Sequence, residues 1–142
     1  MVSSMLGQFG DQVVLLSPME TFEEGTLLTF YYHMMLSDED TTAALTVFTY
    51  SQLHAYERLL IEIRGNHGPQ WQHAEVCLPG GTYQLAFVAT HGLQFSSDIA
   101  LDEIELDDDE WCRSPEYLFF AYENAEHEGK YLTRICKLNK YL

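Results

Sequence analysis

The stretch from Trp71 to Leu106 constrains the fold most, because its apolar and polar residues alternate with the two-residue period of β-strands. Within it, the segments WQHAEVCL and TYQLAFVAT alternate separately, and Pro79-Gly80-Gly81 lies between them as a turn signal. A third segment, SDIALDEIEL, follows. The stretch therefore predicts three consecutive strands.

The third of these strands changes phase halfway along. Ile99 and Leu101 share one face, whereas Ile104 and Leu106 share the other. A β-bulge near Asp102-Glu103 would return all four apolar side chains to the interior, because a bulge adds one residue to the register. The pattern therefore predicts a kinked strand with acidic side chains at the kink.

The remainder of the chain up to residue 112 adds strands and no helical periodicity. Residues 1–10 form a weakly patterned lead-in, and Met19 to Gly25 is an acidic connection. Four further strands are predicted at Gln12 to Pro18, Leu27 to Met35, Ala43 to Tyr50 and Tyr56 to Arg64. Seven evenly spaced strands separated by turn residues are typical of an all-β, jelly-roll-like antiparallel β-sandwich. We assign residues 11–112 to this module.

Residues 113–142 do not continue the strand pattern. Leu132, Ile135, Leu138 and Leu142 fall at helical spacing. The prediction is a short C-terminal tail outside the module, part of it helical.

The charge is strongly acidic and unevenly distributed. Residues 1–112 hold two arginines and eighteen acids, a net charge of −16, whereas residues 113–142 hold five bases and four acids, a net charge of +1. Because nucleic acids and anionic membranes bind through lysine and arginine, this balance excludes both as partners of the module. The chain shows no signal segment and no apolar run long enough to cross a bilayer.

Four ordered blocks resemble the MAM domain, the extracellular adhesion and receptor module of meprins, neuropilins and receptor protein tyrosine phosphatases. They are LLSP at Leu15 to Pro18, LLTFYYHMML at Leu27 to Leu36, RGNHGPQWQHAEVCLP at Arg64 to Pro79, and FVATHGLQFSSDIALDEIEL at Phe87 to Leu106. The first third of the family pattern has no counterpart here. The resemblance therefore implies a partial module with an incompletely closed sandwich and an unpaired sheet edge, which invites association.

The cysteines leave the disulfide pattern open. The chain has Cys77, Cys112 and Cys136, and an odd count leaves at least one thiol without an intrachain partner. The resemblance implies that Cys112 pairs with position 27, which is a leucine here. Cys112 could then pair with Cys136, remain a thiol or bond another chain, while Cys77 faces outward in mid-strand and is the less natural mate. Cys112 and Cys136 are the disulfide candidates.

We expect no enzyme, because no nucleophile elbow, zinc-protease motif or phosphate-binding glycine loop is present. The one cofactor that the acids admit is Ca²⁺, with Asp98, Asp102 and Glu103 as candidate ligands beside the bulge. The alternative is that Asp98 caps a turn and Asp102 is solvated.

Three histidines could be drawn as a zinc set but are expected at the surface on separate elements. They are His67, His73 and His91.

Trp71 and Tyr31 lie opposite the best apolar stripes and are the partner-binding candidates, the alternative being that loops or the second sheet cover them. The resemblance implies a non-catalytic recognition module that contacts protein partners, itself included, in an extracellular or cell-surface parent. The missing signal segment predicts that the chain is a fragment of that larger protein. The alternatives are a calcium- or carbohydrate-binding jelly roll and an accessory domain of a metalloprotease ectodomain.

Overall fold

The computed structural model describes residues 2–4, 11–36, 42–92 and 98–114. These residues form nine strands, and no helix occurs among them. The strands are β1 (Val2–Ser4), β2 (Gln12–Leu16), β3 (Glu20–Phe22), β4 (Thr26–Met35), β5 (Ala44–Ser51), β6 (Ala55–Arg64), β7 (Gln72–Leu78), β8 (Gly81–Thr90) and β9 (Asp98–Asp108). The predicted all-β fold is confirmed.

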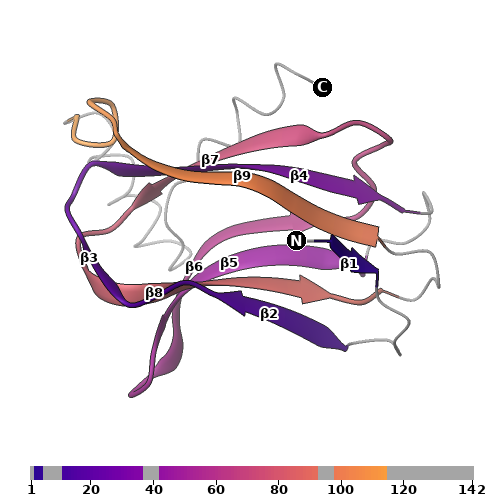
Figure 1. The fold of residues 1–142 in the computed structure, drawn as a ribbon, viewed down its shortest axis with the longest axis horizontal. Coiled ribbons are helices and arrows are strands. Elements are labelled where there is room, and N and C mark those ends of the chain that lie inside the picture. The colour runs from indigo at the N-terminus through magenta and orange to yellow at the C-terminus, as the bar shows by residue number, and fades with distance from the viewer. Residues whose placement is uncertain (1, 5–10, 37–41, 93–97, 115–142) are drawn as a thin grey trace.

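Two antiparallel sheets make up the sandwich (Figure 1). The first sheet has the order β1-β9-β4-β7, and the second has the order β2-β8-β5-β6, with β3 pairing to the start of β8. Neighbours within a sheet are mostly distant in sequence, so the chain crosses repeatedly between sheets. Such crossing connections are typical of jelly rolls and Greek-key sandwiches.

The core lies between the sheets and is built by the predicted alternation. On β4, Phe30, Tyr32 and Met34 point inward and are buried. Phe30 meets Phe87 of β8 edge to face, with ring centroids 5.5 Å apart and planes at 87°. Because aromatic pairs favour this geometry, the contact fixes how the two sheets stack.

The predicted bulge in β9 is confirmed. Thr29 of β4 pairs with Glu105, but Tyr31 pairs with Asp102, so two residues of β9 oppose Phe30. One of them, Glu103, has φ of +49°, a left-handed conformation that non-glycine residues adopt rarely.

The prediction that all four apolar residues of this strand are buried is wrong in part. Ile99 and Leu101 are buried, whereas Ile104 and Leu106 remain 40% and 42% exposed. The bulge does turn the latter two toward the space between the sheets. They stay exposed because they line an open groove between β9 and the strands β2 and β3.

Two short strands were missed. β1 lies in the predicted lead-in, and β3 lies in the predicted acidic connection. β3 is held by tertiary contacts: Phe22 stacks on Tyr83 with ring centroids 4.7 Å apart, and Thr21 shares a 2.8 Å hydroxyl hydrogen bond with Thr82. Three residues are too few to show a period of two, so the sequence carries no signal for them. The predicted helical segment of the tail lies outside the described residues, and the predicted domain boundaries stay a prediction.

Candidate recognition face

The outer face of the first sheet carries the candidate site. Strand register places Tyr31 of β4 between His73 of β7 and Asp102 of β9. Directly opposite residues point to the same side of a sheet. We call this surface the recognition face, and it comprises Thr29, Tyr31, His33, Trp71, His73, Glu75 and Asp102.

Two ring pairs dominate the recognition face. Tyr31 packs on His73 with centroids 4.7 Å apart, and Trp71 packs on His33 with centroids 5.6 Å apart. His33 is held in turn, because its Nε2 lies 3.0 Å from the carbonyl oxygen of Pro69. A hollow of about 350 Å³ lies beside Tyr31 and Trp71. The face therefore presents partly immobilised aromatic groups next to a concavity.

Tyr31 and Trp71 are 38% and 48% exposed. The alternative expectation, that loops or the second sheet cover them, does not hold for the part of the chain that the structure describes. They are large side chains with a polar tip, the type that most often anchors protein partners.

Of the predicted calcium ligands, Asp102 and Glu103 lie at the bulge, on one border of the recognition face, whereas Asp98 is the first residue of β9. Asp102 Oδ1 accepts a hydrogen bond of 2.8 Å from the backbone N–H of Glu103. Only the backbone of Asp98 is described. Across residues 2–4, 11–36, 42–92 and 98–114 no group of three or more histidine, cysteine or acidic side chains is placed to hold a metal ion. Calcium binding therefore stays a prediction.

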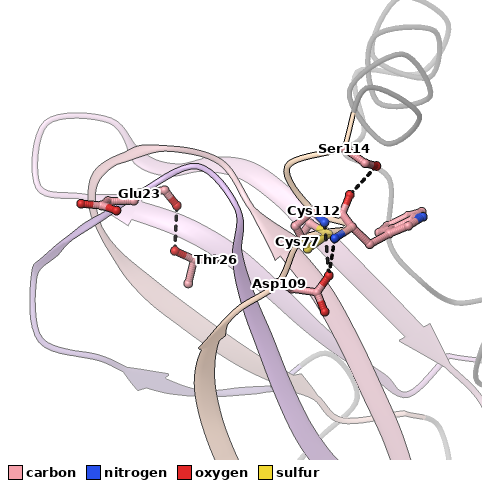
Figure 2. The surroundings of a disulfide bond; sticks show 7 residues. Glu23, Thr26, Cys77, Asp109, Cys112 and Ser114 are labelled. Atoms are coloured by element: carbon pink, nitrogen blue, oxygen red, sulfur yellow. Dashed lines mark hydrogen bonds between the residues drawn. A yellow bond between two sulfur atoms is a disulfide. The ribbon is translucent and has the colours of Figure 1, made fainter.

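The disulfide joins Cys112 to Cys77, with Cα atoms 5.5 Å apart (Figure 2). Of the two disulfide candidates, Cys112 does form a disulfide, but its partner is Cys77, which was expected to be the less natural mate. Cys136 lies outside the described residues. Alternation placed Cys77 correctly on the outer face of the sheet. It is nevertheless only 1% exposed, because Trp111 and Cys112 cover it together with Leu27.

The segment that follows β9 reaches Cys77 through a turn capped by Asp109. The Oδ1 atom of Asp109 accepts hydrogen bonds from the backbone N–H groups of Trp111 and Cys112, at 2.8 and 3.3 Å (Figure 2). Ser114 closes the turn with a 2.7 Å bond from its hydroxyl to the carbonyl of Trp111. An aspartate bonding backbone groups two and three residues ahead is a turn device. Asp109 belongs to the acidic run DDDE, residues 107–110, so this run contains the residue that directs the chain to the disulfide.

The three histidines drawn as a zinc set lie apart. His67 packs edge-on against Tyr32, whereas His73 is on the recognition face. His91, expected at the surface, is 2% exposed, and its Nδ1 lies 2.5 Å from the carbonyl oxygen of Gly92.

Comparison with known proteins agrees with this architecture. The chain is 29% identical over 108 residues to "MAM domain-containing glycosylphosphatidylinositol anchor protein 1" of Gallus gallus, which covers 75% of this chain and 11% of that protein. It is 33% identical over 102 residues to "MAM domain-containing protein 2" of Mus musculus, which covers 69% of this chain and 14% of that protein. The chain thus spans only a small fraction of the length of these relatives.

Among solved structures, the cleaved K1 adhesin domain of Lys-gingipain from Porphyromonas gingivalis W83 matches with a TM-score of 0.56 and 24% identity, over 76% of this chain and 72% of that one. At that identity the likeness concerns the fold alone. The family model "MAM domain, meprin/A5/mu" matches residues 1–113. Because this match covers more than half of the chain, the chain belongs to the MAM domain family.

Proposed function

We propose that this chain is a non-catalytic recognition module that binds another protein through the recognition face, with Tyr31 and Trp71 as its anchors. MAM domains are in general extracellular modules of adhesion type, and the proposal applies that role to a particular surface. The observation that carries it is the pair of exposed, mutually braced ring contacts, Tyr31 with His73 and Trp71 with His33.

Physical reasons support this surface as a contact. An aromatic side chain that is already held by its neighbour loses little conformational freedom on binding, so more of its burial contributes to affinity. The acids Glu75, Asp102 and Glu105 surround the rings. They favour a partner whose facing surface is basic, and they make homophilic contact through this face weaker at low salt than at high salt.

An extracellular setting is consistent with the disulfide, since such bonds persist in oxidising compartments. No helix of the described residues has the length and apolarity needed to cross a membrane.

The test uses the full chain in two formats. Sedimentation velocity over a range of concentrations measures homophilic association, and the biotinylated chain assembled on streptavidin measures attachment to intact cells. We expect Tyr31→Ser with Trp71→Ser to weaken whichever binding is found by about tenfold or more, as loss of interface anchors does. The matched control is Tyr56→Ser, another exposed tyrosine, which lies on β6 of the other sheet.

Equal losses in the control and the double variant, with both chains folded, would refute the recognition face as the contact. Repeating the assays with a chelator and with Asp98→Asn separates the alternative jelly-roll function. Binding that disappears when calcium is removed would favour a calcium-dependent site over the proposed aromatic contact.

A further inference from the structure

The hollow on the recognition face is lined by aromatic rings and by a carboxylate. It has a volume of about 350 Å³, and its lining residues are Tyr31, Trp71, Gln72, His73 and Glu75. His73 and Glu75 alternate along β7, so they point to the same side of the sheet, about 7 Å apart along the strand. Tyr31 of β4 lies directly opposite His73, and Trp71 immediately precedes β7. Rings and carboxylate therefore meet in one concavity.

The size of the hollow restricts what can enter it. Pockets for small organic ligands have volumes of about 300 to 1,000 Å³, so this hollow lies near the lower limit. It is too small for a helix of a partner, since an α-helix with its side chains is about 10–12 Å across. The occupant that fits is a single inserted side chain or a small group of similar size.

The chemistry of the lining selects a cation. The faces of tyrosine and tryptophan rings carry negative electrostatic potential, which attracts ammonium and guanidinium groups. The side chains of Tyr31 and Trp71 are exposed, so a partner can reach them. Glu75 is half-buried, and its carboxylate charge is therefore screened less by salt and water than that of a fully exposed acid. An anionic group would be repelled by both the rings and the carboxylate.

Among cationic side chains, arginine matches this lining best. Its guanidinium is planar and weakly hydrated, stacks on aromatic faces, and donates two parallel hydrogen bonds to a carboxylate. Rings and carboxylate line the same hollow, so one guanidinium can contact both. The field of the whole chain agrees, because its net charge is −15 and no lysine or arginine occurs from residue 65 to residue 112.

We propose that the hollow receives an arginine side chain of the protein partner, with its guanidinium against the rings of Tyr31 and Trp71 and hydrogen-bonded to Glu75. This inference rests on the proposed function, because it names the group by which the partner enters the recognition face. The rings supply contact area for the guanidinium, and Glu75 is the specificity-determining residue. Its carboxylate distinguishes arginine from an uncharged side chain of the same shape.

The experiment follows the indole N–H signals of Trp71 and Trp111 in proton–nitrogen correlation spectra of the full chain during titration with N-acetylargininamide. Trp111 is the internal control, because it packs on the Cys77–Cys112 cluster and is not among the residues that line the hollow. We expect the Trp71 signal to shift saturably with a Kd on the order of 1 mM, the strength of one inserted group. The citrulline analogue keeps the shape and loses the charge, so it should bind at least about tenfold more weakly.

Variants of the chain test the carboxylate and the rings separately. Glu75→Gln should weaken binding of the arginine analogue by about tenfold and leave binding of the citrulline analogue unchanged, because only the charged contact is lost. Tyr31→Ser should weaken binding of the arginine analogue several-fold, because it removes a ring face. Glu57→Gln is the matched control for the carboxylate, since Glu57 is an exposed glutamate on β6 of the other sheet and should leave binding unchanged.

Three results would overturn the arginine site. Equal Kd values for the arginine and citrulline analogues would exclude a site for a cation. An equal effect of Glu75→Gln on both analogues would exclude contact between the guanidinium and the carboxylate. Tighter binding of tetramethylammonium than of the arginine analogue would assign the hollow to a quaternary ammonium group, such as a lipid headgroup, in place of an arginine.

The failure of this inference can be told from the failure of the proposed function. If the arginine analogue does not bind but Tyr31→Ser with Trp71→Ser still weakens attachment to cells or self-association, the recognition face stands and the arginine site falls. If the arginine analogue binds as expected but that double variant attaches and associates like the parent chain, the partner binds elsewhere. The latter result overturns the proposed function and, with it, the assignment of the arginine to that partner.

Discussion

Removing the Cys77–Cys112 disulfide should lower the free energy of unfolding of the sandwich by an amount that depends on the length of the loop that the bond closes. The bond closes a loop with a sequence separation of 35 residues. In the chain-entropy description, cross-linking a loop of that length stabilises the folded state by about 3.8 kcal/mol at 25 °C. For a domain of this size, that loss lowers Tm by about 10–20 °C.

The perturbation is the double variant Cys77→Ala with Cys112→Ala, compared with the oxidised parent chain by thermal and urea unfolding followed by circular dichroism. The single variant Cys136→Ala is the control and should leave Tm unchanged. The size of the effect does not identify the pairing by itself, because a bond between Cys112 and Cys136 would be worth about 3.4 kcal/mol by the same relation. The pairing needs a covalent readout.

Trypsin provides that readout, because no lysine or arginine lies between Arg64 and Arg113. Residues 65–113 form one tryptic peptide that contains both Cys77 and Cys112. Under non-reducing conditions we expect this peptide to be lighter than its reduced form by two hydrogens. We expect Cys136 in the separate peptide of residues 135–137. Recovery of these two peptides joined by a disulfide, or a loss of stability in Cys136→Ala, would refute the pairing.

Three other perturbations have defined outcomes. Gly25→Ala should destabilise the chain by more than about 1 kcal/mol in urea unfolding, because Gly25 has φ of +94° and an added Cβ would overlap the side chain of Arg113. An unchanged urea midpoint would contradict the packing of Arg113 against Gly25. Burial raises the pKa of Tyr32 to about 12 from 10.0. The stabilisation by the neutral side chain is therefore fully present below pH 10, and about 2–3 kcal/mol of it is lost as pH rises toward 12. A Tyr32→Phe chain whose free energy of unfolding falls equally steeply at alkaline pH would refute the assignment of this loss to Tyr32. The double variant Leu27→Cys with Cys77→Leu moves the half-cystine from β7 to β4. It should leave Tm within a few degrees of the parent, since the two positions are cross-strand partners. If peptide mapping found no bond between position 27 and Cys112, the result would contradict the β4–β7 register.

The strands that were predicted correctly are those whose own residues specify both faces. β7 and β8 alternate over seven and ten residues, so their periodicity fixes the inward side before any partner is known. The bulge in β9 was predictable for a related reason, because Ile99 and Ile104 cannot share a face without an extra residue between them. β1 and β3 exist only through pairing with β9 and β8.

The burial of side chains was predicted less well than the side of the sheet toward which they point. The side follows from local alternation, whereas burial depends on which distant segments cover that side. Ile104 and Leu106 point toward the sandwich interior as predicted, but the described strands do not cover that edge. Cys77 shows the opposite error. It points outward as predicted, yet a segment more than thirty residues downstream folds over it. Of the partner-binding candidates, alternation gave the face of Tyr31, while its ring contact with His73 required the β4–β7 register.

The position of the disulfide follows from the sheet register more than from either strand alone. The family resemblance implied a cysteine at position 27, and Leu27 pairs directly with Cys77 across β4 and β7. Side chains directly opposite in antiparallel strands have Cβ atoms about 5 Å apart, so a cysteine that folds over the sheet from beyond β9 can reach either one. Leu27 and Cys77 both contact Cys112 in one small buried cluster. A cysteine at position 27 or at position 77 could therefore bond Cys112. Either bond would hold the segment after β9 at the same place on the sheet, next to the recognition face.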